Sequence, residues 1–218
     1  DRIRPLHPSL RLLPRNERSD RTSGGAKPDA VTPPQGVNFA RRNTDDVAEA
    51  MGWPGIIGLG ETMNYPGVIN GSQQMLEEIA ATLRAGKTVG GHCARPDRVI
   101  PFHAYAAGGP SVDHEGTREQ VALDRVRQGM RGMLQLGSAW HDIESQITAI
   151  TEKGLDPRNF ILCTDDCHPG TLVHEGHMNR ALRHASACGC DPLVALQTGT
   201  INTATHVGLE RELGSIAP

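Results

Sequence analysis

Aromatic residues are scarce in this 218-residue chain, at 3% of the sequence, so its core must be built mainly from Ala, Val, Ile and Leu. No apolar run approaches the roughly 20 residues that a membrane helix needs, and no secretory signal is visible. The net charge of -3 argues against a general role in binding nucleic acid or membrane surfaces. We therefore expect a cytoplasmic protein that binds neither.

Cysteine is also sparse, and its spacing shows no disulfide framework. The five cysteines are Cys93, Cys163, Cys167, Cys188 and Cys190. A zinc knuckle is one interpretation, but Cys163 and Cys167 lie four positions apart and the pair at 188 and 190 has no matching partner pair. An odd number without a framework is typical of free thiols in a reducing compartment. We expect five free thiols.

Residues 1–43 differ in character from the remainder of the chain. Arginines are scattered there among prolines and polar residues, and we find no period of 2 or 3.6 residues. A basic arm that binds nucleic acid is one interpretation, and an irregular lead-in is the other. We favour the irregular N-terminal segment, because the arginines are not clustered and no aromatic side chains lie between them for stacking.

From Asp45 onward, apolar stretches alternate with amphipathic ones, which is the pattern of parallel β/α architecture. Strands are expected at 55–60, 87–91, 108–113, 130–136 and 159–164. Helices are expected at 45–51, 72–85, 97–107, 117–128, 139–153 and 171–187, with another beginning at 191. Met75, Ile79 and Leu83 form the apolar stripe of helix 72–85, and Thr117 is expected to cap helix 117–128.

The predicted fold class is therefore α/β. A complete eight-stranded barrel takes about 250 residues, more than the regular region offers. Two architectures are therefore possible for residues 44–207. They form part of a (β/α)8 TIM-type barrel, namely most of its second half, or they form an open parallel sheet.

Potential metal ligands follow four of the predicted strands. They are Glu61, His92, His114 and Asp165. Because the C-terminal ends of parallel strands meet on one face, four repeats of this design predict a single metal centre. Imidazole and carboxylate donors suit Zn, Mn or Fe. Such a site supports hydrolysis, since the ion lowers the pKa of bound water and Asp165 can accept the proton.

Each of these residues also has a plainer interpretation when it is taken singly. A lone histidine at a strand end is often structural, and Asp165 or Asp166 could cap the following helix. Glu115, Asp166 and His168 adjoin the proposed ligands and could orient them through hydrogen bonds. Ser138 and Asn64 are candidates for substrate contact, although a turn explains Asn64 equally well. The other histidines of the regular region are expected on the surface: His103, His141, His174, His177, His184 and His206.

Several motifs occur together in this order. The first is Gly58-Leu59-Gly60-Glu61 with Met63-Asn64-Tyr65-Pro66-Gly67-Val68. The later ones are Gly91-His92, 104–108, Asp113-His114-Glu115, Gly137-Ser138-Ala139, 164–169, 175–177 and 213–218. Over residues 52–218 the chain resembles the bacterial adenine deaminases of the amidohydrolase superfamily, which contain a segment that reads GLGE-x-MN-[FY]-PGV.

The resemblance implies a distorted TIM barrel with a binuclear site, usually described with Mn or Fe, that hydrolyses adenine to hypoxanthine and ammonia in purine salvage. It implies metal ligands at Glu61, His92, His114 and Asp165, with Asp165 moving the proton. From the residues themselves, Glu115 is a further catalytic candidate, and Asn64, Ser138, Asp166 and His168 are candidates for substrate contact. The expected partners are a purine base and further copies of the chain.

Two features depart from the family pattern. The family's first ligands form an H-x-H pair on strand one, and no H-x-H occurs in this chain. Residues 208–218 resemble the point where the family leaves the barrel for a β-sandwich, so we expect a truncated product whose exposed strand edges favour association. The alternatives are another amidohydrolase, such as a dihydroorotase-like cyclic amidase, and a non-catalytic remnant.

Overall fold

The computed structural model describes residues 44–94 and 100–216, so the predicted segment 1–43 lies outside the described residues. Its five strands are β1 (Gly58–Thr62), β2 (Thr88–Gly91), β3 (Val112–Asp113), β4 (Arg131–Gln135) and β5 (Phe160–Cys163). They form one sheet in the order β1-β2-β3-β4-β5, and every neighbouring pair is parallel. The predicted α/β class is confirmed, and the unclosed sheet corresponds to part of a barrel.

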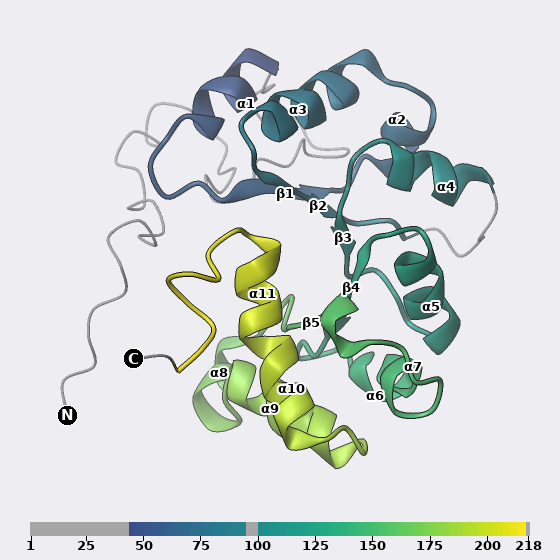
Figure 1. Ribbon diagram of the computed structural model, residues 1–218, viewed down its shortest axis with the longest axis vertical. Coiled ribbons are helices and arrows are strands. Elements are labelled where there is room, and N and C mark those ends of the chain that lie inside the picture. The colour runs from purple at the N-terminus through teal and green to yellow at the C-terminus, as the bar shows by residue number, and fades with distance from the viewer. Residues whose placement is uncertain (1–43, 95–99, 217–218) are drawn as a thin grey trace.

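Helices connect successive strands, as the parallel pairing requires. Those before β3 are α1 (Thr44–Met51), α2 (Tyr65–Ile69), α3 (Gln73–Arg84) and α4 (Ile100–Ala107). The middle group is α5 (Glu119–Arg127), α6 (Ile143–Gln146) and α7 (Thr148–Thr151). The last group is α8 (Pro169–His174), α9 (Met178–Ala187), α10 (Pro192–Gly199) and α11 (Ile201–His206). Figure 1 shows α3, α4, α5 and α9 following one another around the outside of the curved row of strands.

Aliphatic side chains fill the space between the sheet and these helices, as the scarcity of aromatics predicted. One cluster of buried residues includes Val47, Leu59, Met75, Ile79 and Val89. The other includes Leu134, Ile143, Ile147, Phe160 and Leu162. The five cysteines are free thiols, which confirms that prediction. No helix in the described part of the chain is long and apolar enough to cross a membrane.

The predicted stripe of helix α3 is one turn too long. Met75 and Ile79 are buried, but Leu83 is 49% exposed. Each four-residue step overshoots a helical turn by about 40°, so the third member of the series has rotated away from the sheet.

Backbone constraints shorten or divide other predicted elements. The strand expected at 108–113 is reduced to Val112–Asp113, because Gly109 has a φ of 122° and Pro110 cannot donate a ladder hydrogen bond. The helix expected at 171–187 is divided into α8 and α9 at Gly176, whose φ is 108°. The loop predicted after Glu61 contains the short helix α2.

The start of α6 and the capping residue of α5 also differ from the prediction. A helix was expected from residue 139, but a bridge joins Leu136 to His141, and Gly137 donates its N–H to the Trp140 carbonyl at 2.9 Å. Helix α6 therefore begins only at Ile143. Thr117 does not cap α5, because the residue at the cap position is Arg118, whose side chain makes no capping hydrogen bond.

The second cluster should dominate the stability of the sheet. Leu134 is completely buried on β4, so Leu134→Ala should lower the free energy of unfolding by about 2–5 kcal/mol. Leu193 is 76% exposed, so Leu193→Ala should change the free energy of unfolding by less than about 0.5 kcal/mol. Urea unfolding followed by circular dichroism measures both. Equal losses for the two variants would contradict the assignment of the core.

Candidate metal centre

Three proposed ligands from successive strand ends meet at the C-terminal edge of the sheet. Glu61 is the second-to-last residue of β1, His92 follows β2 directly, and His114 follows β3 directly. The Nδ1 atom of His92 lies 3.0 Å from the Oε2 atom of Glu61. The same nitrogen lies 3.1 Å from the Nε2 atom of His114. The two imidazoles and the carboxylate therefore face a common point.

A second group of three residues shares His114 with the first. Its Nε2 atom lies 3.6 Å from the Oδ2 atom of Asp165, beyond β5, and 3.7 Å from the Oε1 atom of Glu115. Within each group the ligand atoms all lie within 4.8 Å of one another. The structure thus brings together all four predicted ligands and adds Glu115 to the cluster.

Local irregularities of the backbone aim two of these carboxylates. In the pairing of β1 with β2, Leu59 lies opposite Val89 but Glu61 lies opposite Gly90, so Gly60 is an extra residue. A bulge of this kind re-aims the side chain that follows it. Asp165 has a φ of 53° and is the only described residue other than glycine with a positive φ. Asp is among the few residues that adopt this conformation readily.

The charges in the first group perturb one another. The hydrogen bond with His92 holds the pKa of the Glu61 carboxyl below its usual value, although burial acts in the opposite direction. The same contact raises the pKa of His92, and the charge of Glu115 adds to the rise. The pairing thus favours the charged form of each group. A divalent ion fits this donor set of imidazoles and carboxylates and would compete with protons for the same atoms.

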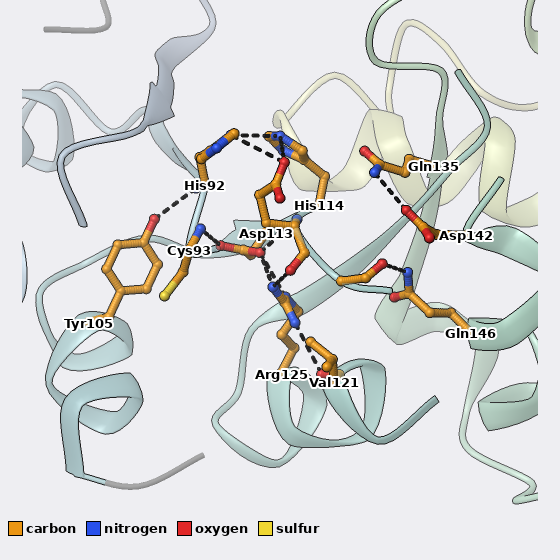
Figure 2. A network of polar contacts seen from close by, with 12 residues as sticks. His92, Cys93, Tyr105, Asp113, His114, Val121, Arg125, Gln135, Asp142 and Gln146 are labelled. Atoms are coloured by element: carbon orange, nitrogen blue, oxygen red, sulfur yellow. Dashed lines mark hydrogen bonds and ion pairs between the residues drawn. The ribbon is translucent and has the colours of Figure 1, made fainter. Parts of the chain in front are cut away.

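Figure 2 shows a buried polar network beneath the two histidines. Asp113 is completely buried and Arg125 is 1% exposed, and the guanidinium lies against the carboxylate. The hydroxyl of Tyr105 accepts the backbone N–H of His92 at 2.9 Å. We had not predicted a role for any of these three residues. The available signals were an aspartate directly before His114 and a charged residue on the apolar side of α5.

The residues predicted to contact substrate make hydrogen bonds within the loops. Asn64 caps α2, and its Oδ1 atom accepts the N–H of Gly67 at 3.0 Å. The hydroxyl of Ser138 accepts the N–H of His168 at 2.7 Å, and the N–H of Ser138 is donated to the carbonyl of Asp166 at 3.0 Å. These contacts hold the 164–168 loop against the end of β4. Their roles toward a substrate stay predictions.

A cavity of about 340 Å³ is lined by residues of all five strands or of the segments that follow them. Glu61, His114 and Asp165 line it, and so does His206 from the end of α11. His206 was expected on the surface, but it lines this cavity. Burial and the positive charge of Arg131 lower the pKa of His206 to about 4, so it is neutral at pH 7.

Comparisons with known proteins identify the family of this chain. A profile of the amidohydrolase family matches residues 42–218. Over 174 residues the chain is 75% identical to a protein of Jannaschia sp. (strain CCS1) named adenine deaminase 1, covering 80% of this chain and 29% of that protein. It is 48% identical to the adenine deaminase of Moorella thermoacetica, with the same two shares of coverage. The chain thus spans less than a third of the length of these curated relatives.

One solved structure with a similar fold is a β-aspartyl dipeptidase of Fervidobacterium islandicum AW-1 in complex with a β-Asp-Leu dipeptide. The TM-score is 0.56 at 16% sequence identity, and the match covers 83% of this chain and 54% of that chain. At this identity the likeness supports the fold alone.

The contact between Glu61 and His92 predicts a pH effect in the metal-free chain. Because the pKa of Glu61 is lowered and that of His92 is raised, their pairing stabilises the fold between the two pKa values. This contribution is lost as pH rises through the raised His92 pKa, and as pH falls through the lowered Glu61 pKa.

Glu61→Gln should therefore lower the pKa of His92 towards its ordinary value of 6.5. Imidazole chemical shifts in an NMR titration of the chelator-treated chain measure this pKa. Glu152→Gln, at an exposed position beyond α7, is the control and should leave it unchanged. An unchanged His92 pKa in Glu61→Gln would show that the two side chains do not pair in solution.

Proposed function

The chain belongs to the amidohydrolase family, and from that premise we propose that it carries the catalytic face of a metal-dependent adenine deaminase. The observation that carries this proposal is the convergence of five metal-ligand side chains at one sheet edge. They are Glu61, His92, His114, Glu115 and Asp165. The 75% identity to a protein named adenine deaminase supports adenine as the substrate.

We assign one ion site to Glu61, His92 and His114, and we assign Glu115 and Asp165 as further donors beside it. The Nε2 atom of His114 faces both groups but can bind only one ion, because it has a single lone pair. Their nitrogen and oxygen atoms suit Mn or Fe, with Zn as a further possibility. A divalent ion held there lowers the pKa of water in contact with it and so makes a nucleophile available near neutral pH. No H-x-H pair is present in this chain, so the proposal depends on these five donors.

The proton transfers are assigned to two carboxylates on either side of His114. In the overall reaction, water adds to the ring carbon that bears the exocyclic amine, a C–O bond forms, the C–N bond breaks, and hypoxanthine and ammonia result. Asp165 takes a proton from the attacking water and passes it to the departing amine. Glu115 transfers a proton to the ring nitrogen next to the reacting carbon, which stabilises the addition product, and it recovers a proton from the added hydroxyl when the C–N bond breaks and the carbonyl forms. Both carboxylate oxygens lie within 3.7 Å of the His114 ring nitrogen, so the two proton carriers share one site.

Substrate contacts are assigned to the loops at the same edge of the sheet. Ser138, Asp166 and His168 lie together after β4 and β5, and Asn64 lies after β1. We further propose a cytoplasmic enzyme of purine salvage that acts on a free purine base rather than on nucleic acid or a membrane. We also propose that it assembles with copies of itself, because the outer edges of β1 and β5 pair with no other strand among the described residues, and unpaired edges favour association.

Other readings of the same site make different predictions for substrate and metal. A dihydroorotase-like cyclic amidase would hydrolyse dihydroorotate and release no ammonia from adenine. A non-catalytic remnant would bind no divalent ion and turn over neither substrate. Metal analysis of the purified chain, followed by assays with both substrates, separates the three possibilities.

Asp165→Asn is the sharpest test of the chemistry, because Asn adopts the positive φ of this position as readily as Asp does. The fold should be kept, while loss of the proton carrier should lower kcat for adenine by about 10²–10⁴-fold. Conversion of adenine to hypoxanthine is followed by ultraviolet absorbance in the manganese-loaded chain.

The matched control is Asp156→Asn, at an exposed position before β5, which should leave kcat unchanged. The proposal would be overturned by a folded, manganese-loaded wild-type chain that releases no ammonia from adenine. A fully active Asp165→Asn variant would remove Asp165 from the proton transfer.

A further inference from the structure

The buried Asp113 carboxylate accepts the backbone N–H of the residue that follows each of the two proposed histidine ligands. We propose that Asp113, held by Arg125 and assisted by Tyr105, is a positioning residue that sets the spacing of the donors on β1, β2 and β3. This inference rests on the proposed metal-dependent function. It assigns a role in ion binding to side chains that themselves lie below the ion site.

Both oxygens of Asp113 accept backbone N–H groups next to ligands. The Oδ2 atom accepts the N–H of Cys93, the residue after His92, at 2.7 Å. The Oδ1 atom accepts the N–H of Glu115, the residue after His114, at 3.0 Å. One rigid carboxylate therefore links two chain segments that leave different strands.

Arg125 supplies the positive charge that makes this buried carboxylate tolerable. Its Nε atom donates to the Oδ1 atom of Asp113 at 2.8 Å, and its Nη2 atom contacts the same oxygen. The Nη2 atom also donates to the carbonyl of Glu115 at 2.7 Å, so both the N–H and the carbonyl of that residue are held. The guanidinium lies 5.7 Å from the centre of the Phe102 ring. Helix α5 is thus fastened to the loop that carries His114.

Tyr105 extends the network to the first strand. Its hydroxyl accepts the N–H of His92 at 2.9 Å and lies 3.4 Å from the carbonyl of Thr62, the residue after Glu61. Gly91 permits this close approach, because a Cβ atom there would lie 2.9 Å from the Tyr105 hydroxyl and 3.0 Å from the Oδ2 atom of Asp113. Figure 2 shows Tyr105 directed toward His92, and Arg125 directed toward Asp113, beneath the histidine pair.

Burial alone does not explain this arrangement. A buried ion pair contributes little net stability, and replacing both partners with apolar side chains of similar size is often neutral or stabilising. Here the oxygens of Asp113 accept hydrogen bonds from the backbone N–H groups of the residues next to two proposed ligands. Groups that orient metal ligands from outside the first shell typically affect metal affinity by about 10- to 100-fold. The pair should therefore matter more for ion binding than for folding.

The test measures Mn²⁺ affinity by electron paramagnetic resonance titration of the whole chain, at a temperature where circular dichroism shows every variant folded. Asp113→Asn keeps the size of the side chain but brings an amide NH2 against existing donors. It should weaken Mn²⁺ binding by about 10- to 100-fold. Arg125→Lys should lose less affinity than Arg125→Met, because it keeps the charge.

The double variant Asp113→Leu/Arg125→Met separates positioning from stability. It should recover much of the stability lost in either single variant, since no unpaired charge is left buried. It should not recover Mn²⁺ affinity, since the hydrogen bonds to Cys93 and Glu115 stay absent. Leu134→Ala is the control for destabilisation of the core elsewhere, and it should bind Mn²⁺ as the wild type does.

Each outcome decides between the claims. Wild-type Mn²⁺ affinity in the folded Asp113→Asn and double variants would overturn the positioning role while leaving the proposed function intact. Weakened affinity in Leu134→Ala to the same extent would reduce the effect to general stability and overturn it as well. Absence of Mn²⁺ binding by the wild-type chain would instead overturn the metal-dependent function on which the inference rests.

Discussion

All five strands of the sheet run in one direction, so their C-terminal ends reach a single edge. This constraint brings Glu61 and Asp165 into one cluster, although more than half of the regular chain separates them in sequence. Helices packed on the outer face supply the apolar contacts that hold the strands in register. The C-terminal edge of the sheet can then carry polar and charged groups whose burial would otherwise oppose folding.

Placing carboxylates and imidazoles this close together is unfavourable unless a proton or a cation lies among them. In the absence of a cation, the hydrogen bond between Glu61 and His92 offsets part of this cost, and it lowers the pKa of Glu61 and raises that of His92. A second layer lies below, where Asp113 and Arg125 neutralise each other and hold the backbone beside His92 and His114. The upper layer is suited to bind an ion in competition with protons, and the lower layer keeps the donors in place when the ion binds.

The sequence predicted the alternation of strands and helices, and it predicted Glu61, His92, His114 and Asp165 as residues at strand ends, because both depend on local patterns. It could not predict where α8 ends, since the break depends on the φ of Gly176. It also missed Asp113 and Arg125. Their partnership joins β3 to α5 through the folded core, and no spacing rule distinguishes such a pair from two solvated charges. His206 was misplaced for a similar reason, since only the packing of α11 brings it to the cavity.

The proposed function depends on Glu61, His92 and His114 binding one divalent ion, and diffraction from crystals of the manganese-loaded chain tests this most directly. We expect an anomalous scattering peak at coordination distance from the His92 and His114 nitrogens and a Glu61 oxygen. A peak elsewhere on the chain, or no peak at saturating Mn²⁺ with these side chains ordered, would contradict it.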